Sequence, residues 1–292
     1  MKIVSWSVNG IRAAWNHGLA SFLAKTDAEI FAFQETKTDE AIPEMELEGY
    51  EPYWSFCKRK RGYSGTLVLM RTHPRCVWYS FPGQDFDCEG RIITLDFGTF
   101  FLVNCYVPNS IRSEYRKDYR TKWDELLLVH LKKLRYRKPT IVCGDFNVPI
   151  SDDDIYAENK WVKLNGQGFQ STERENLLAI VESRFVDSYR RIHLEETGGY
   201  TWWSSRRYKR KKSGMVSRLF FVSDNLEERV TESAMCGDIM GSDHCPIFLD
   251  IDIQADTPVA ENSHTIWKKK IHYEELIKLN GLSYISKQKT RT

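Results

Sequence analysis

Length, composition and charge already exclude several classes of protein. The chain has 292 residues, of which 41% are hydrophobic, 13% aromatic and 28% charged, so it can bury a sizeable core and is too mixed in composition to be disordered. Its 42 Lys and Arg residues stand against 40 Asp and Glu, which leaves a net charge of only +2. Any nucleic-acid binding must therefore depend on where the charges lie, not on their sum.

The ends and the cysteines indicate a compartment. The first residues, MKIVSWSVNG, lack the apolar core of a signal peptide, and no stretch approaches the roughly 20 apolar residues of a membrane span. Seven cysteines are scattered without CxxC spacing, which favours reduced thiols and argues against a zinc site. We therefore expect a cytoplasmic protein without membrane contact, associated with the nucleoid in a bacterium or nuclear in a eukaryote.

Short apolar runs typical of strands alternate with segments of helical periodicity. The expected strands are 3–8, 29–33, 65–70, 91–97, 100–107, 140–144, 218–223 and 244–251, and the expected helices are 11–25, 112–134 and 172–183. Most of these strands are too apolar to have a face in water, so helices must cover the sheets. The pattern predicts a layered α/β sandwich.

The same pattern predicts one domain and an appended tail. No repeat and no Pro/Gly/Ser-rich linker divides residues 1–252. Residues 253–292 form the tail: after Ile253 comes the polar linker QADTPVAENSHT, then helical spacing of apolar residues over 267–280, and finally a Lys/Arg-rich stretch.

Polar side chains follow two of the expected strands, which is the usual place for functional residues in α/β sheets. Glu35 comes after 29–33, and Asp145 and Asn147 come after 140–144 in the sequence GDFN. In extended backbone, residues two apart point the same way, so this carboxylate and amide could activate water and stabilise charge on one phosphate ester. A solvated loop carboxylate and an Asx turn are the simpler alternatives.

Two further pairs lie at strand ends. Asp243 and His244, in GSDHCP, could supply a metal-side carboxylate and an imidazole donor to a phosphoryl oxygen. Tyr106 and Asn109, in YVPN, could reach a phosphate, or could simply end a strand at a proline turn.

Ten motifs occur in the order and approximate spacing of one family: SWSVNGIRA, QETK, GYSG, GRI, CYVPNS, YRTKWDELL, GDFNVP, FVDSYR, YTWWS and GSDHCPI. Over essentially residues 1–252, the chain resembles the exonuclease III family of abasic-site endonucleases, within the endonuclease/exonuclease/phosphatase superfamily. The resemblance implies a four-layer α/β sandwich in which two central mixed sheets pack face to face and are flanked by helices.

The resemblance also implies an activity and a set of site residues. It implies Mg²⁺-dependent cleavage of the phosphodiester 5′ to an abasic site, with 3′-to-5′ exonuclease and 3′-phosphodiesterase activity and with Mn²⁺ as a substitute metal. The implied partner is double-stranded DNA with abasic sites or 3′ ends, bound by a monomer. The implied catalytic residues are Tyr106, Asp145, Asn147 and His244; the implied metal-side residues are Glu35, Asp243 and Ser7; and Asn9 and Asn109 are implied DNA contacts. Such an oxygen-rich set suits Mg²⁺ better than zinc.

Two positions depart from the family pattern. Ser7 stands where the opening motif normally has an Asn that helps to hold the metal or the phosphate. The penultimate strand normally carries Arg-hydrophobic-Asp after a Trp, whereas residues 214–223 read GMVSRLFFVS. The Asp position falls on Arg218 in ungapped register and on Phe220 with one residue deleted, so the carboxylate that normally pairs with the active-site histidine is absent. We therefore expect an active but slowed nuclease.

A basic run predicts how DNA is held. The sequence YTWW, in which Trp203 is the second tryptophan, leads into a run whose basic residues include Arg206, Arg207, Lys209 and Arg210. Such an arm would neutralise phosphates and make binding sensitive to salt, although a solvated face is the simpler alternative. Trp203 is expected either to pack in the core or to shape a pocket for the base-free sugar.

Two alternatives to a DNA-repair nuclease stay open. The absent carboxylate and Ser7 favour a paralogue that binds nucleic acid without efficient cleavage. A superfamily phosphodiesterase that acts on lipid head groups or nucleotides is the other alternative, and the basic run after YTWW argues against it.

Overall fold

The computed structural model describes residues 1–45, 47–83, 86–110, 113–156, 171–194, 199–203, 214–239 and 241–256. The first sheet contains β1 (Lys2–Ser7), β2 (Ile30–Gln34), β3 (Glu51–Ser55), β4 (Thr66–Met70), β11 (Val230–Met235) and β12 (Ile247–Ile251), in the order β11-β12-β1-β2-β4-β3. The second contains β5 (Cys76–Trp78), β6 (Ile92–Asp96), β7 (Phe101–Tyr106), β8 (Thr140–Asp145), β9 (Phe185–Asp187) and β10 (Arg218–Ser223), in the order β5-β6-β7-β8-β10-β9. Both sheets are mixed, because β1 pairs in parallel with β2 and β7 with β8, among otherwise antiparallel neighbours.

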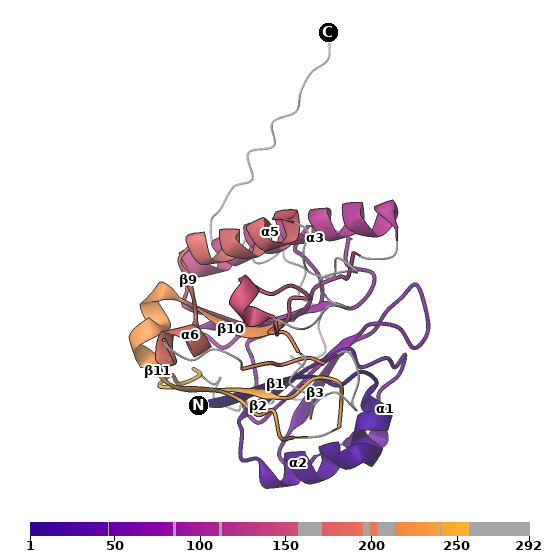
Figure 1. The fold of residues 1–292 in the computed structure, drawn as a ribbon. Helices are drawn as coiled ribbons and strands as arrows, with labels where there is room; N and C mark the ends of the chain where they lie inside the picture. The colour runs from indigo at the N-terminus through magenta and orange to yellow at the C-terminus, as the bar shows by residue number, and fades with distance from the viewer. Residues whose placement is uncertain are drawn as a thin grey trace.

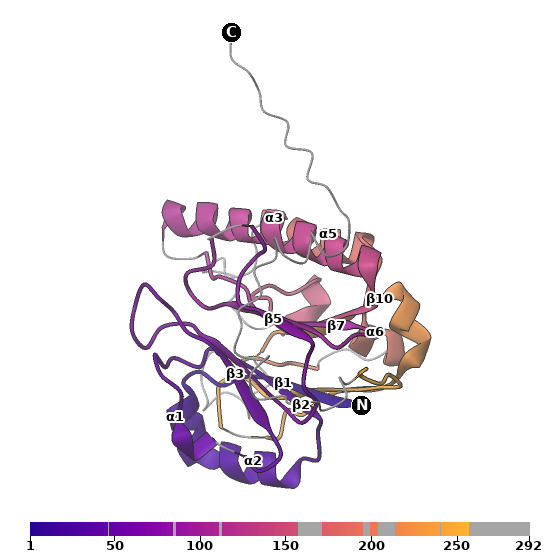
Figure 2. The same ribbon diagram turned by 180° about the vertical axis from the view of Figure 1, so that it is seen from behind.

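Helices cover the outer face of each sheet (Figures 1 and 2). On the first sheet lie α1 (Ile11–Ala14) and α2 (Ala20–Lys25), joined by the turn η1 (Trp15–Leu19). On the second lie α3 (Glu114–Arg137) and α5 (Ser171–Glu182), while α6 (Ser188–Ile192) and the short turns Pro43–Met45, Asp152–Asp154 and Asp224–Arg229 connect other elements. The predicted four-layer α/β sandwich is confirmed.

The central core lies between the two sheets, and it explains the continuous apolar runs. Ile3 on β1 and Phe220 on β10 pack in this core. Their neighbours Val4 and Phe221 point the other way and pack in the two cores beneath the helices. A strand that is buried on both faces needs an apolar side chain at nearly every position.

The predicted strands are the inner ones, and the strands that the apolar pattern missed are the edge ones. Both edges of each sheet, β11 and β3 in the first and β5 and β9 in the second, were outside the predicted set. Edge strands have one unpaired side and are often short or partly polar, so an apolar run does not mark them. The strand β11, with the sequence VTESAM, is an example.

Two predicted boundaries are wrong for local reasons. The expected helix 11–25 is interrupted where Gly18 has a φ of 111°, a conformation that L-residues rarely adopt. The expected strand 244–251 begins only at Ile247, since Pro246 has no N–H to give to a sheet. His244 is therefore in a loop, where it forms an isolated bridge with Trp202.

Helix α3 ends later than the predicted helix 112–134 and starts at a cap. Ser113 is extended, and its Oγ accepts a hydrogen bond of 3.3 Å from the Arg116 N–H. The side chain of Ser113 thus satisfies a donor of the first turn, as an N-cap does. At the other end, Lys138 precedes Pro139 and is extended, which stops the helix at Arg137.

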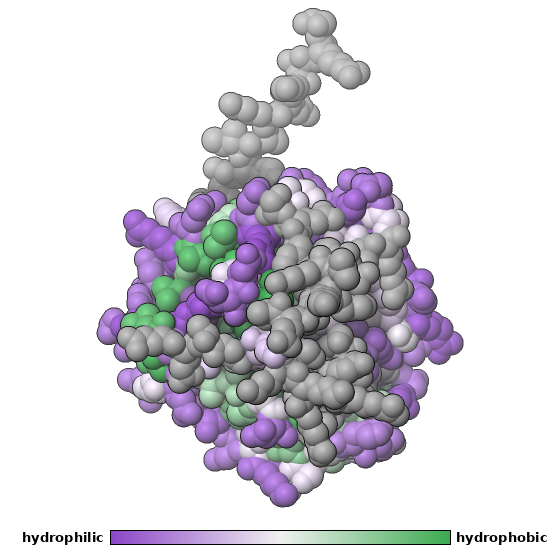
Figure 3. Space-filling view, viewed as in Figure 1, coloured by the Kyte–Doolittle hydropathy of each residue, from purple (hydrophilic) through white to green (hydrophobic). Residues whose placement is uncertain are grey.

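The remaining features of the fold are the character of the surface, the state of the cysteines and the end of the packed domain. Hydrophilic side chains cover most of the described part of the face in Figure 3, with smaller hydrophobic areas between them. Within the described residues, no helix is long and apolar enough to cross a membrane. None of the seven cysteines, all of which lie in the described part of the chain, forms a disulfide. Packing continues to Ile253, and residues 257–292 lie outside the described residues, so the domain boundary at 252 stays a prediction.

The buried histidine of α3 predicts a pH-dependent stability. The Nε2 atom of His130 lies 2.9 Å from the Oγ1 of Thr94 on β6, and burial lowers the pKa of His130 to about 3 from an ordinary 6.5. Below pH 6.5 the imidazole of His130 is protonated in the unfolded chain, whereas in the folded protein it stays neutral down to about pH 3. As the pH falls from 6.5 to 3, the free energy of unfolding should therefore decrease by about 1.4 kcal/mol for each pH unit. Urea denaturation at several pH values should show a flatter decline for His130→Gln, and parallel declines for variant and parent would contradict the assignment.

Candidate active site

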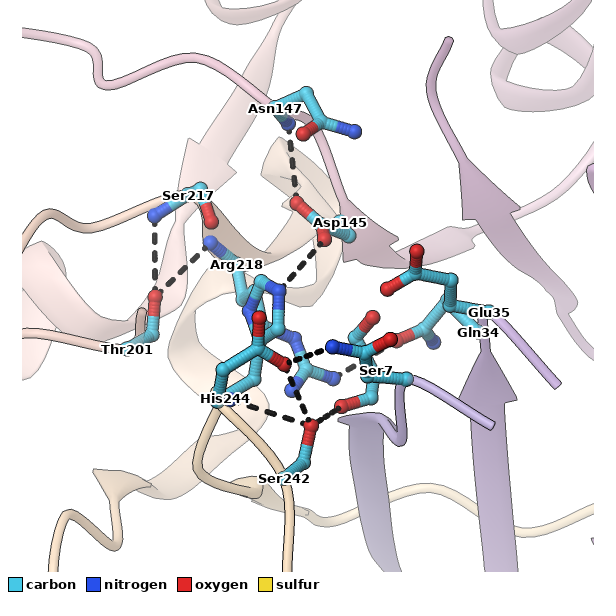
Figure 4. Close-up of polar contacts among 12 residues, drawn as sticks. Ser7, Gln34, Glu35, Asp145, Asn147, Thr201, Ser217, Arg218, Ser242 and His244 are labelled. Atoms are coloured by element: carbon cyan, nitrogen blue, oxygen red, sulfur yellow. Dashed lines mark hydrogen bonds and ion pairs between the residues drawn. The ribbon is translucent and has the colours of Figure 1, made fainter. Parts of the chain in front are cut away.

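Polar residues from both sheets meet at one end of the sandwich (Figure 4). From the first sheet come Ser7, the last residue of β1, and Glu35, which follows β2. From the second come Asp145, the last residue of β8, and Asn147. Because β1 pairs with β2 and β7 with β8 in parallel, the carboxyl ends of these strands share an edge. His244 joins them from the loop before β12.

Three of these site loops hold their residues in the left-handed backbone region. The φ angles are 49° for Asn9, 58° for Glu35 and 55° for Asn147. Asn tolerates this region, but a Glu there is uncommon and carries local strain, which concentrates at functional sites. The backbone carbonyl of Glu35 is held by a 2.8 Å hydrogen bond from the N–H of Gly10, so the two metal-side loops fix each other.

Asp145 is a buried carboxylate at the centre of the site. It is 1% exposed, and its Oδ1 accepts a 3.1 Å hydrogen bond from the Asn147 N–H. Burial raises the pKa of Asp145 to about 7, although the positive charge of Arg218 and the Asn147 N–H act in the opposite direction. A carboxylate with a pKa near neutrality is suited to act as a general base. Only a glycine fits before it, since a Cβ on Gly144 would lie 1.8 Å from the carbonyl oxygen of Cys105.

Asn147 is fixed by the loop that follows β7. Its Nδ2 donates a 2.8 Å hydrogen bond to the carbonyl of Val107. The buried Arg120 of α3 ties the same two loops together, because its guanidinium donates to the carbonyls of Pro108 at 2.8 Å and Phe146 at 3.1 Å. An amide nitrogen carries two hydrogens, so Asn147 can still donate to a phosphate oxygen.

His244 faces Asp145, and Asp243 faces the metal side. The Nε2 of His244 lies 3.5 Å from the Oδ2 of Asp145. The Oδ1 of Asp243 accepts hydrogen bonds from the Nδ2 of Asn9 at 2.9 Å and from the hydroxyl of Ser242 at 3.1 Å. Burial alone would raise the pKa of Asp243, but the charge of His244 and these two hydrogen bonds lower it. Asp243 is therefore ionised at neutral pH.

The metal-side residues offer oxygen atoms to a cation. The ammonium group of Lys37 lies 3.1 Å from the Oε1 of Glu35 and also donates to the Oδ1 of Asn9, so a positive charge already sits between these oxygens. The hydroxyl of Ser7 is fully buried and has no hydrogen-bond partner within the described part of the chain. No group of three or more His, Cys, Asp or Glu side chains that could hold a metal occurs among the described residues. Few carboxylates and several neutral oxygens suit Mg²⁺, which usually keeps several waters, so the residues fit this ion.

Tyr106 is held by a buried arginine. The guanidinium of Arg91 lies 4.5 Å from the centre of the Tyr106 ring and donates to the Tyr106 carbonyl at 3.1 Å. Burial, together with the nearby Glu35, raises the pKa of Tyr106 well above its ordinary value, so the phenol keeps its proton as a donor. Asn109 follows in the loop after β7, where its carbonyl accepts a 3.4 Å hydrogen bond from Arg116.

The residues expected at the DNA are only partly described. Trp203 is 6% exposed, and its backbone N–H donates a 3.0 Å hydrogen bond to the Asp243 carbonyl. Its indole packs tightly, because a Cβ on Gly214 would lie 3.1 Å from the indole nitrogen. Trp203 is thus packed against the loop of Asp243, and its contact with the base-free sugar stays a prediction. The basic residues Arg206, Arg207, Lys209 and Arg210 lie outside the described residues.

Strand register shows how the two candidates for the position of the missing carboxylate lie. Arg218 pairs with Asp145 across β10 and β8, whereas Phe220 pairs with Cys143 and packs between the sheets. The fully buried guanidinium of Arg218 donates to the Oε1 of Gln34 and to the carbonyl of Cys245, each at 2.8 Å. Burial lowers the pKa of Arg218 to about 10, which still leaves it charged at neutral pH.

Sequence reasoning named no role for three residues that support the site. They are Gln34, Lys37 and Arg91, which lie in the motifs QETK and GRI. The available signal was a polar residue beside an apolar run, since Gln34 ends β2 and Arg91 directly precedes β6. Both side chains are buried in the structure. A polar residue in such a place must find a buried partner.

Comparison with known proteins decides the family. The profile of the endonuclease/exonuclease/phosphatase family matches residues 4–244. The chain belongs to this family. An exodeoxyribonuclease of Bacillus subtilis (strain 168) is 40% identical over 255 residues, which are 87% of this chain and 100% of that protein. The DNA repair nuclease APEX1 of Danio rerio is 37% identical over 254 residues, which are 85% of this chain and 81% of that protein.

A solved structure agrees with this assignment. An AP endonuclease from Archaeoglobus fulgidus superposes with a TM-score of 0.76 at 26% identity, covering 87% of this chain and 100% of that one. The expected family and its class of hydrolytic, metal-dependent nucleases of DNA repair are therefore confirmed.

Proposed function

We propose that this endonuclease/exonuclease/phosphatase family member is a Mg²⁺-dependent DNA-repair nuclease that hydrolyses the phosphodiester 5′ to abasic sites in double-stranded DNA. At 3′ ends the same site acts as a 3′-to-5′ exonuclease and 3′-phosphodiesterase. The observation that carries this proposal is the convergence of a buried carboxylate, Asp145, with the donors Asn147 and His244 and with the oxygens of Glu35. Asp243, next to His244 in the chain, adds a carboxylate held by Asn9 and Ser242.

The side chains divide the chemistry between them. Asp145 accepts a proton from water as the water oxygen bonds to phosphorus and the bond to the leaving oxygen breaks. Asn147 and His244 donate hydrogen bonds to the phosphate oxygens, where negative charge grows in the transition state. Tyr106, which keeps its phenolic proton, donates to the same phosphate. These donors are held by the protein before substrate binds, so they need little reorganisation.

The metal belongs on the side of Glu35, Asp243 and Ser7, with Mn²⁺ able to replace Mg²⁺. When bound, the ion neutralises charge on the phosphate as a Lewis acid. The ammonium group of Lys37 contacts Glu35 and Asn9 and therefore balances part of the negative charge on this side of the site.

DNA is held as a duplex by a monomer. Asn9 and Asn109 lie on loops at the rim of the site and contact the sugar-phosphate backbone of the DNA. Trp203 borders the position of the base-free sugar, and the arm that contains Arg206, Arg207, Lys209 and Arg210 neutralises phosphates.

A nicking assay on a duplex with one abasic site, run beside filter binding, tests the proposal. Mg²⁺-dependent incision 5′ to the abasic site is the expected result. Tight binding without incision in either Mg²⁺ or Mn²⁺ would identify a binding protein instead. Neither binding nor incision, with hydrolysis of a small phosphodiester, would identify a phosphodiesterase with another substrate.

Replacing Glu35 with Gln should weaken metal binding without unfolding the protein. The carboxylate lies at the metal side in contact with Lys37 alone among described charged groups, so its loss removes a ligand and little packing. We expect an unchanged thermal midpoint and a higher Mg²⁺ concentration for half-maximal nicking. Glu40→Gln, at an exposed ion pair with Arg12, is the matched control and should leave the Mg²⁺ dependence unchanged. Parent-like nicking by Glu35→Gln at limiting Mg²⁺ would remove Glu35 from the metal site.

Neutralising the basic arm should reduce the salt dependence of DNA binding. Replacing Arg206, Arg207, Lys209 and Arg210 with Gln should flatten the plot of log K against log salt by about 0.9 for each phosphate contact that is lost. The exposed Lys132 and Lys133 of α3, replaced with Gln, serve as the control and should leave the slope unchanged. Equal slopes for the arm variant and the parent would show that the arm is a solvated loop.

A further inference from the structure

Arg218 is a fully buried cation to which the chemistry above assigns no role. Within the described residues its guanidinium makes no direct ion pair and is held by neutral oxygens, those of Gln34 and Cys245. Taking a charged group out of water without a direct counter-ion costs several kcal/mol. A side chain retained at such a cost, at the end of the strand that pairs with Asp145, indicates a role at the site.

The first acceptor connects Arg218 to the metal side. Gln34 immediately precedes Glu35, and its Nε2 donates to the hydroxyl of Ser5 at 2.9 Å and to the Oδ1 of Asn104 at 2.8 Å. These bonds fix the orientation of the amide, so its Oε1 faces Arg218 and accepts the 2.8 Å hydrogen bond. The end of β2 that presents Glu35 is thereby tied to β10 in the opposite sheet.

The second acceptor connects Arg218 to the catalytic histidine. Cys245 immediately follows His244, and its carbonyl accepts the other 2.8 Å hydrogen bond from the guanidinium. The N–H of Cys245 donates to the Thr201 carbonyl at 3.1 Å, and the Thr201 hydroxyl accepts from the N–H of Arg218 at 3.3 Å. The loop of His244 is therefore held to β10 on two sides.

We propose that Arg218 is a positioning residue of the nuclease reaction, which fixes Glu35 and His244 relative to Asp145 by bridging Gln34 and the Cys245 carbonyl. Its buried positive charge also balances the carboxylates Asp145 and Asp243, with which it interacts through space. In this chain an arginine thus organises the histidine loop from the strand position where the family pattern places a carboxylate. This inference rests on the proposed nuclease function.

The test compares Arg218→Met and Arg218→Lys on an abasic duplex at saturating Mg²⁺, with kcat, KM and the thermal midpoint measured for each. A misplacement of about 1 Å in a catalytic group can cost about 10²-fold in rate, so kcat of Arg218→Met should fall by about that factor while KM changes little. Lys keeps the charge but reaches one acceptor in place of two, so Arg218→Lys should recover part of kcat. Gln34→Met, which breaks the bridge from the other side, should also lower kcat, and its effect should not add to that of Arg218→Lys.

The control is Arg135→Met, which breaks a 2.6 Å ion pair with Asp224 away from the site and should leave kcat unchanged. If Arg218→Met does not fold, the Gln34→Met and Arg218→Lys variants carry the test. An active parent whose kcat is unaffected by these changes would overturn the positioning role and leave the nuclease function intact. A change in KM without a change in kcat would overturn it as well. So would a loss of kcat that tracks the thermal midpoint and that Arg135→Met shows to the same extent. An inactive parent would overturn the proposed function and this inference with it.

Discussion

Replacing Asp145 with Asn should lower the rate of Mg²⁺-dependent nicking by about 10²–10⁴-fold, the range expected when a general base is lost. Asn has almost the same shape but cannot accept the proton from water, and the Asn147 N–H can still donate to its amide oxygen. Binding of the abasic duplex should change little, because Asp145 is buried and acts on the water and not on the DNA backbone.

The same substitution should not lower stability. Burial raises the pKa of Asp145 from 3.8 to about 7, so between these pH values the folded protein holds a proton that the unfolded chain has released. Stability therefore falls as pH rises through this window, and above about pH 7 the folded protein bears the full cost of a buried charge. Without metal, Asp145→Asn should have a thermal midpoint equal to or above that of the parent at alkaline pH.

Asp224→Asn is the matched control, since it removes a carboxylate that pairs with Arg135 far from the site. It should leave the nicking rate unchanged. Parent-like nicking by Asp145→Asn would exclude Asp145 as the base, whereas a large drop in its thermal midpoint would mean that its rate loss reflects unfolding.

Replacing Arg218 with Asp, which restores the family carboxylate, should damage the protein and not accelerate it. The substitution leaves the Gln34 Oε1 and the Cys245 carbonyl without their buried donor and sets a second carboxylate opposite Asp145. A buried acceptor left without its donor typically costs about 1–3 kcal/mol, and a second buried carboxylate near Asp145 adds electrostatic repulsion to this cost. We therefore expect a lower urea midpoint and a lower nicking rate than in the parent.

Arg218→Asn is the comparison that isolates charge, because Asn also loses the bridge but adds no negative charge. Arg218→Asp should be the less stable of the two. A faster nuclease with parent-like stability from Arg218→Asp would show that the carboxylate can return without further changes. Phe220→Asp should be worse than either, since Phe220 packs between the sheets at 2% exposure.

The inner strands, the layered sandwich and the family can all be recognised from the order of the amino acids. Inner strands are buried on both faces, so their composition records the fold directly, and β1, β2, β4, β6, β7, β8, β10 and β12 were found within a few residues. The motifs also placed Glu35, Asp145 and Asn147 at strand ends, because a polar residue after an apolar run is visible in one dimension.

The contacts between distant residues, in contrast, follow from the three-dimensional packing. The edge strands β3, β5, β9 and β11 are defined by the neighbours they pair with and not by their own composition. Asn9 and Asp243 are 234 positions apart and meet only because β12 returns beside β1. The register of β10 against β8 placed Arg218 opposite Asp145, between Gln34 and Cys245, which the ungapped and gapped readings of the sequence left undecided. Such contacts depend on packing between segments distant in the chain, and no local pattern of residues encodes them.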